Sequence, residues 1–295
     1  MSAADIRSLA PGDEAELDRF LMAHADTAMF LRSNLRAVGL VDEGKPFQGT
    51  WFCAFAGGRI VVVAVHGWNG IVLVQAENDR HEVDLGMAAL AAVEATKPRG
   101  RTITGIIGPF SQVGTTRTAL DLDRRKASLE NKEYLYALDL AKLVLPHGAA
   151  RVRPTTADDM ELCAAWRVDY CQEAMSMSVE ESRVRSRDDV ERTHARGDSF
   201  LLEDAGGAPV SYSAFNARLP EAVQIGGVWT PKDLRGNGYA RAVVGGSLLL
   251  ARAFGVNRAT LFTGEWNGSA QKAYEALGFE RIGDYGIVYF SGGAD

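Results

Sequence analysis

The sequence is poor in cysteine, in long apolar runs and in excess positive charge. Three cysteines among 295 residues are too few for a disulfide framework. No apolar run approaches the roughly 20 residues that a membrane-spanning helix needs. The first residues also lack the basic start and apolar core of a signal peptide. These absences predict a protein of the reducing cytoplasm that has no membrane partner.

Charge and histidine spacing argue against two further classes. The formal net charge is −6 and the pI is about 5.5, so a uniformly basic surface for nucleic acid is absent. The same charge disfavours aminoacyl transfer from tRNA. The five histidines do not show the close spacing of metal ligands, so no metal is expected. Nothing in the composition predicts an oligomeric state.

The chain is long enough for two domains of about 150 residues each, and it shows one order of elements twice. The joint is expected at Pro146-His147-Gly148, which gives domains at residues 1–146 and 147–295. Each half begins with a helical stretch, from Asp13 to about Phe30 and from Thr156 to about Glu173. Three strands follow, then a long helix, a strand, a short helical stretch and a last strand.

The expected strands are 50–56, 60–66, 71–75, 102–107 and 133–140 in the first half, and 199–203, 209–215, 222–229, 259–263 and 282–290 in the second. The expected long helices are 82–95 and 239–254, the second with Gly245-Gly246 where it packs closely on the sheet. Paired glycines at Gly57-Gly58 and Gly206-Gly207 mark equivalent hairpin turns. This order predicts an α/β protein, or α+β mixed sheet, with two tandem domains, each a mostly antiparallel sheet flanked by helices.

The turn after the third strand differs between the two halves. In the second half it is basic and glycine-rich, with Arg235, Gly236 and Gly238 directly before a helix. Backbone N–H groups at a helix N-terminus, with glycines that allow close approach, suit a phosphate. In the first half, residues 76–84 carry four carboxylates and no glycine. A phosphorylated cofactor is therefore expected in the second half alone.

Two motifs in the second half resemble those of one family. Arg235-Gly-Asn-Gly-Tyr-Ala240 fits the pattern Arg/Gln-x-x-Gly-x-Gly/Ala, and Asn267-Gly-Ser-Ala270, Tyr274 and Gly278-Phe279 fit Asn-x-x-Ala-x-x-x-Tyr-x-x-x-Gly-Phe. Together they resemble the GNAT acetyltransferase superfamily. The motifs cover about residues 225–280, and the element order about 149–292. The first half resembles the fold alone, as in tandem GNAT proteins with a degenerate N-terminal copy.

This resemblance implies an acyl-CoA-dependent N-acyltransferase that transfers acetyl from acetyl-CoA, or another acyl group, to a primary amine of a small molecule or peptide. Amides of residues 236–241 would hold the pyrophosphate, and strand backbone near residues 228 and 230 would pair with the pantetheine arm. The expected donor-binding residues are Val228, Trp229, Thr230, Arg235, Gly236, Asn237, Gly238, Tyr239, Ala240, Arg241 and Asn267. The resemblance also implies that Tyr274 is the general acid, although helical periodicity alone makes it a core-facing aromatic.

The acceptor side of the reaction is less clear in the sequence. Gly226-Gly227 predicts a β-bulge in the strand expected at 222–229, where the family splays its sheet. The charged stretch from Glu180 to Arg196 predicts an amphipathic helix that could edge the acceptor site. Gln224 stands where a carboxylate base would be convenient. Candidate bases are Glu173, Glu221 and Glu265, each of which also reads as a solvated carboxylate. The missing base keeps open a non-catalytic acyl-CoA-binding sensor or regulatory module.

Overall fold

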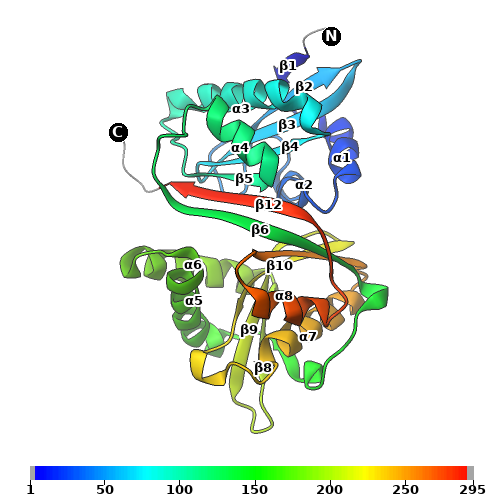
Figure 1. Cartoon of the computed structure of the whole chain (residues 1–295), viewed down its shortest axis with the longest axis vertical. Helices are drawn as coiled ribbons and strands as arrows, with labels where there is room; N and C mark the ends of the chain where they lie inside the picture. Colours follow the sequence, from blue (N-terminus) through cyan, green and yellow to red (C-terminus); the bar gives the residue numbers. More distant parts are fainter. Residues whose placement is uncertain (1–3, 291–295) are drawn as a thin grey trace. The chain divides into compact units, whose positions relative to one another are not determined.

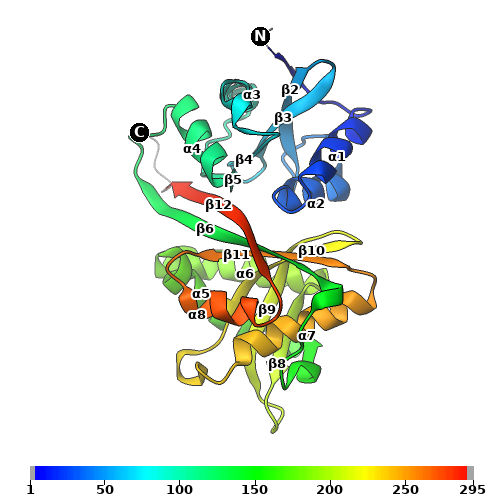
Figure 2. The ribbon, with the colours of Figure 1, turned by 45° about the vertical axis from the view of Figure 1, so that its right-hand side comes forward.

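The computed structural model describes residues 4–290, and the chain divides into two compact units. Unit 1 takes in the chain up to Glu133 together with the segment from Gly283 onward, and unit 2 comprises Tyr134–Ile282. The ribbon of each unit is drawn in Figure 1 and Figure 2. Between residues 4 and 290, no helix combines the length and the apolar character needed to cross a membrane.

The sheet of unit 1 is mostly antiparallel. Its strands, in spatial order, are β1 (Asp5–Ser8), β2 (Gly49–Ala56), β3 (Arg59–Gly67), β4 (Ile71–Ala76), β5 (Gly105–Pro109), β12 (Glu280–Phe290) and β6 (Ala127–Asp139). Among the pairs from β1 to β12, β4 and β5 are parallel and the others are antiparallel. Helices α3 (Glu82–Thr96) and α4 (Phe110–Ala119) lie on one face, and α1 (Glu14–Ala23) and α2 (Met29–Val38) lie on the other (Figure 2). Because helices cover both faces, β3 is buried at every position from Ile60 to Gly67.

Unit 2 repeats this plan. In spatial order its strands are β6, β11 (Arg258–Gly264), β10 (Ala222–Trp229), β9 (Pro209–Arg218), β8 (Ser199–Glu203) and β7 (Val152–Pro154). The β10–β11 pair is parallel, and the pairs from β10 to β7 are antiparallel. The helices are α7 (Tyr239–Ala253) and α8 (Gly268–Glu275), and α5 (Met160–Met175) and α6 (Val179–Ala195).

Side chains of β10 enter the core on both faces of the sheet of unit 2, because the register shift between Gly226 and Trp229 interrupts the alternation along the strand. Val223 and Ile225 pack in one cluster with Leu248 of α7. Trp229 packs in a second cluster with Cys163 of α5 and Tyr212 of β9. The strand therefore has α7 on one side and α5 on the other, and its backbone is held from both faces.

The closing strands of the two halves are exchanged. Strand β12, which ends the second half of the chain, pairs with β5 of unit 1 from Tyr285 to Tyr289. Strand β6, which ends the first half, lies beside β11 in the sheet of unit 2. The compact units accordingly change over inside β6, after Glu133, and inside β12, after Ile282. The expected joint at residues 146–148 follows β6 in the chain, within unit 2.

From the first helix of each half onward, the predicted element order is confirmed, and the strands expected at 199–203 and 222–229 have the observed bounds. The short strands β1 and β7, which precede those helices, were not predicted. The charged stretch from Glu180 is confirmed as part of α6. The single helix expected from Asp13 to about Phe30 is wrong, because α1 ends at Ala23 and α2 begins at Met29. The backbone leaves the helical region at His24, and the N–H groups of Thr27 and Ala28 donate to the His24 carbonyl, which turns the chain.

The paired glycines of α7 are explained by close packing, as predicted. A Cβ on Gly246 would lie 2.3 Å from Cγ2 of Val152 in β7 and 2.4 Å from the Ala149 carbonyl oxygen. A Cβ on Gly245 would lie 2.9 Å from Cδ of Pro146. Glycine therefore lets α7 approach β7 and the preceding turn more closely than alanine would.

Candidate functional site

The turn between β10 and α7 presents a row of unused backbone donors. After β10 the chain makes a short 3-10 turn (Lys232–Leu234), and Gly236 (φ +85°) and Gly238 (φ +76°) then take left-handed conformations before α7 begins. A Cβ at Gly236 would meet nothing within 4 Å, so the surface there is open. Within the described part of the chain, the N–H groups of residues 236–241 have no hydrogen-bond acceptor. This is the arrangement of an anion site at a helix N-terminus.

Two basic side chains of the same turn form ion pairs with a carboxylate of helix α5. Arg235 forms an ion pair with Glu173 (2.8 Å), and Lys232 pairs with the same carboxylate (3.3 Å). Arg235 also donates from Nε to the Thr230 carbonyl (3.1 Å) and lies 4.8 Å from the Trp229 ring. The hydrogen bond from Arg235 holds the pKa of Glu173 below its ordinary value. Glu173 is thus a counter-ion of the turn, and its lowered pKa weakens it as a base.

Strand β10 parts from β11 halfway along its length. The two strands pair from Ala222↔Arg258 to Ile225↔Leu261, and the recorded pairing ends there. On the other side, the register with β9 shifts between Gly226 and Trp229, and Gly227 has φ +62°. The predicted bulge at Gly226-Gly227 is therefore confirmed. Beyond it, the backbone of residues 227–229 is released from β11, which gives an extended ligand room to lie along β10.

Two polar side chains lie over these glycines, and sequence reasoning missed both. A Cβ on Gly226 would lie 1.9 Å from Nδ2 of Asn216, and a Cβ on Gly227 would lie 2.8 Å from Nη1 of Arg167. The absence of a side chain at each position therefore makes room for an amide from β9 and a guanidinium from α5. The paired glycines could have signalled close approach, but not which side chains make it.

The second motif lies on α8 and on the residues directly before and after this helix, and it meets the first motif in the core. The side chain of Asn267 accepts from the Ala270 N–H and caps α8, as predicted. Tyr274 is 8% exposed and makes an edge-on contact with Phe279, with ring centroids 6.1 Å apart. Its core-facing position is thereby confirmed. Val228 and Tyr239 pack against the same cluster as Tyr274, so strand, turn and α8 converge.

The other residues predicted to bind the donor lie at the end of β10, in the turn that follows it and at the start of α7. Trp229 and Thr230 are buried at the end of β10, and the Thr230 hydroxyl is hydrogen-bonded with Ser211 (2.9 Å). Asn237 donates from Nδ2 to the Leu234 carbonyl (3.1 Å), which closes the turn. Ala240 and Arg241 lie in the first turn of α7, which carries no acidic residue.

The candidate bases are scattered. Glu221 lies in the turn between β9 and β10, where its carbonyl accepts from the N–H groups of Asn257 and Arg258. Glu265 is exposed after β11. Gln224, in the middle of β10, is buried, and its Oε1 has no hydrogen-bond partner within residues 4–290. Gln224 faces Thr260 of β11, whose buried hydroxyl also lacks a partner in that range.

In unit 1, the turn before α3 supplies its own hydrogen-bond acceptors and negative charges at the N-terminus of that helix. Asn78 accepts from the Arg80 N–H, and His81 is hydrogen-bonded with Asp84 (3.0 Å). Glu82 and Asp84 occupy the first turn of α3. Since carboxylates stabilise a helix N-terminus and repel phosphate, α3 lacks the anion site that α7 offers.

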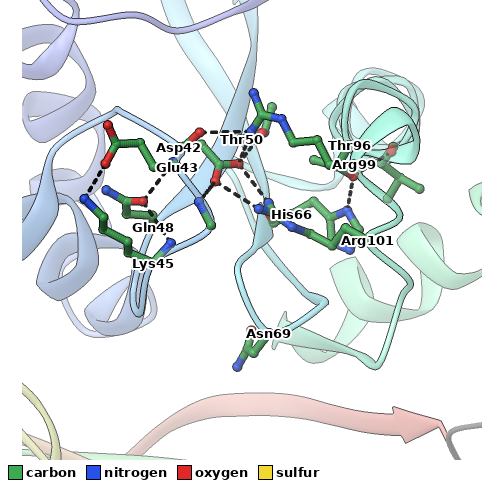
Figure 3. Close-up of polar contacts among 12 residues, drawn as sticks. Asp42, Glu43, Lys45, Gln48, Thr50, His66, Asn69, Thr96, Arg99 and Arg101 are labelled. Atoms are coloured by element: carbon green, nitrogen blue, oxygen red, sulfur yellow. Dashed lines mark hydrogen bonds and ion pairs between the residues drawn. The ribbon is translucent and has the colours of Figure 1, made fainter.

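Unit 1 has instead a polar cluster near the ends of β2 and β3 (Figure 3). Asp42 is hydrogen-bonded to Arg101 through both carboxylate oxygens (2.8 and 2.9 Å) and accepts from Thr50. Burial acts to raise the pKa of the Asp42 carboxyl, but these hydrogen bonds outweigh burial and lower the pKa to about 2. Arg101 also donates to the carbonyl of His66, whose Nδ1 lies 2.6 Å from the Thr96 hydroxyl. The cluster ties the loops before β2 and after α3 to β3.

No group of three or more His, Cys, Asp or Glu side chains in the described ranges is placed to hold a metal ion. The three cysteines are buried and free.

Comparison with protein families matches residues 163–279 to the family described as the acetyltransferase (GNAT) family. The matched segment runs from α5 to the start of β12. A search of curated protein sequences found no significant match.

Solved structures share the fold over nearly the whole chain. A Drosophila protein of structural genomics origin has a TM-score of 0.66 at 11% identity, covering 97% of this chain and 98% of its own. A GCN5-related N-acetyltransferase from Sphaerobacter thermophilus gives 0.59 at 14% identity, with 98% and 95% covered. Another from Kribbella flavida gives 0.55 at 15% identity, with 90% and 94% covered. These likenesses extend the shared fold across both units.

Proposed function

We propose that the chain is an acyl-CoA-dependent N-acyltransferase that acts from unit 2, in which residues 163–279 match the acetyltransferase (GNAT) family. Acetyl-CoA is the proposed donor, and a primary amine of a small molecule or peptide is the acceptor. No metal is required. Three free, buried cysteines fit a reducing, cytoplasmic setting, which is part of this proposal.

The observation that carries the proposal is the set of unused N–H groups at residues 236–241. Gly236 and Gly238 take conformations that L side chains rarely adopt, and both leave the surface open. The donor pyrophosphate fits this turn, with Arg235 and Lys232 beside it. Glu173 now neutralises those two cations, so phosphate binding would compete with an existing ion pair.

The released part of β10 supports the remaining donor contacts. Backbone groups near Val228 and Thr230 would pair with the pantetheine arm, because β11 has separated from β10 at that point. The thioester would then lie by the Gly226-Gly227 bulge. N–H groups of the strand would polarise its carbonyl, and Tyr274 would protonate the departing thiolate. The attacking amine must be neutral, and Glu173, Glu221 and Glu265 are all weak candidates for its base.

For the first half, residues 1–146, we propose a degenerate GNAT-like domain that binds no donor. Support comes from the repeated element order and from the self-satisfied N-terminus of α3. Residues 147–295 would then be the acetyltransferase domain. Each half relies on a closing strand from the other, so the two domains are proposed as one working protein.

The test is thiol release from acetyl-CoA across a panel of amines, measured together with donor binding by calorimetry. Donor binding with amine-dependent thiol release supports the transferase. Donor binding without release for any amine favours the alternative, a non-catalytic acyl-CoA-binding sensor or regulatory module. Absence of donor binding would contradict both functions.

A further inference from the structure

Arg167 is a charged side chain that packs directly on the β10 bulge. It projects from α5 on the same face as Cys163 and Tyr170, which line the core toward the sheet. Its Nη1 lies where a Cβ on Gly227 would come within 2.8 Å, and its Cζ lies 4.6 Å from the Tyr170 ring. The side chain of Arg167 is 13% exposed. It is therefore held rigidly beside the backbone that the proposed function assigns to the thioester.

Most hydrogen-bonding capacity of Arg167 is unused. A guanidinium has five N–H donors. Within residues 4–290, Arg167 makes one side-chain hydrogen bond, from Nη2 to Asp189 of α6 (2.9 Å). Its Nε and Nη1 groups donate to no protein atom there. The Arg167–Asp189 ion pair joins α5 to α6 through Nη2 alone. That role does not explain why Nη1 of Arg167 lies against the backbone of β10.

Asp189 of α6 is the counter-ion that fixes the position of Arg167. Asp189 is approached by Arg185 (Nε–Oδ2, 3.7 Å) and by Arg192, in addition to Arg167. Three guanidinium groups thus share one carboxylate. Burial raises the pKa of Asp189, but the charges of Arg167 and Arg185 keep it below its ordinary value. The carboxylate therefore stays ionised and holds the charged Arg167 side chain in place.

We propose that Arg167 binds an anionic group of the acceptor, so that the preferred acceptors are small amines that carry a carboxylate or a phosphate. This inference rests on the proposed function, because it places the acceptor beside the bulge of β10. In the proposed function, the donor pyrophosphate binds the backbone N–H groups of residues 236–241. The donor therefore does not account for the positive charge of Arg167 at the bulge. Arg167 acts here as a specificity-determining residue, since planar, forked donors suit carboxylate and phosphate oxygens.

The test compares matched amines on the full-length protein. Amino acids are paired with the amines that lack their carboxylate, for example leucine with 3-methylbutylamine, and phosphoethanolamine is paired with ethanolamine. KM and kcat come from thiol release with acetyl-CoA. The same pairs are titrated calorimetrically into the protein with and without coenzyme A. This second readout needs no turnover, so loss of the proposed function and loss of this inference remain distinguishable.

We expect at least one anionic amine to bind about tenfold or more tightly than its neutral partner, as for a charge-assisted hydrogen bond. Arg167→Met should remove that preference and leave donor affinity within about threefold. Arg185→Met is the matched control, because it loses a contact to the same Asp189 without touching the bulge. It should keep the preference. The separate carboxylate and phosphate pairs identify which anion is preferred.

Two results would overturn the proposal. One is a wild-type protein that prefers no anionic amine over its neutral partner, which needs no variant and so does not depend on folding of Arg167→Met. The other is a preference that survives in Arg167→Met. A preference lost equally in both variants would also count against it, because it would assign the effect to overall charge rather than to the side chain at the bulge.

Discussion

Gly238→Glu should abolish tight donor binding with little harm to the fold. Gly238 is exposed and takes φ +76°, and a Cβ built there meets nothing closer than Arg241 at 4.0 Å. Forcing a left-handed conformation on glutamate costs roughly 1–2 kcal/mol of stability. That cost lowers the melting temperature by roughly 2–4 °C per kcal/mol in a domain of this size. The variant should therefore remain folded.

The loss of affinity is expected to be much larger than the loss of stability. A new carboxylate in the turn would lie about 5 Å from a pyrophosphate charge, which at an effective dielectric constant of about 20 gives roughly 3 kcal/mol of repulsion. This corresponds to about a hundredfold rise in Kd for acetyl-CoA. Higher salt should recover part of that loss, because exposed charges are screened.

The matched control is Gly255→Glu, measured by the same calorimetry. Gly255 is exposed, has φ +93° and an equally open surface, and lies just beyond the other end of α7. It imposes the same strain and charge about 22 Å from the donor turn, at 1.5 Å per residue. If the two variants bind acetyl-CoA within about threefold of each other, the pyrophosphate assignment to residues 236–241 is wrong.

Three further predictions address the general acid, the packing and the pH response. Tyr274→Phe keeps the ring beside Phe279, so donor affinity should hold while kcat falls about a hundredfold; an unchanged kcat would refute the general-acid role. Gly246→Ala should lower stability by about 1–3 kcal/mol despite a better helix propensity. Gly114→Ala in α4, where a Cβ meets nothing within 4 Å, should instead be neutral or stabilising by calorimetric melting. Burial, aided by the charge of Arg101, lowers the pKa of His66 to about 4. A lowered histidine pKa favours the neutral folded form, so its stabilisation is present above about pH 6.5 and is lost as pH falls toward about 4. Unfolding curves should show this fall, which His66→Gln should flatten; an identical pH profile in that variant would contradict it.

The conformation of the turn before α7 could be predicted because its signals are local. Positive φ angles favour glycine at positions 236 and 238, and the N-cap of α8 favours asparagine at position 267. The bulge favours the paired glycines Gly226-Gly227. Each of these constraints acts within a few residues of sequence. The break between α1 and α2 was missed because the periodic pattern continues through a turn that hydrogen bonds to His24 impose.

Other features depend on distant parts of the chain. Arg167 and Asn216 come from α5 and β9 and meet the bulge through tertiary packing alone. Glu173 looked like a solvated carboxylate, and its pairing with Lys232 and Arg235 crosses about 60 positions of sequence. The exchange of β6 and β12 likewise leaves no local mark, because a strand reads the same whichever neighbour it pairs with.

That exchange sets the order in which the chain can finish folding. Most of unit 1 is synthesised first, yet β5 has an open edge until residues 283–290 emerge. Unit 1 is therefore the last to be completed, and its unpaired strand edge is exposed to wrong pairing during synthesis. The exchange of strands also makes each half dependent on the presence of the other. Deletion of either half removes a strand from the sheet of the other, which gives a physical reason for keeping the first half even though carboxylates occupy the start of its helix α3.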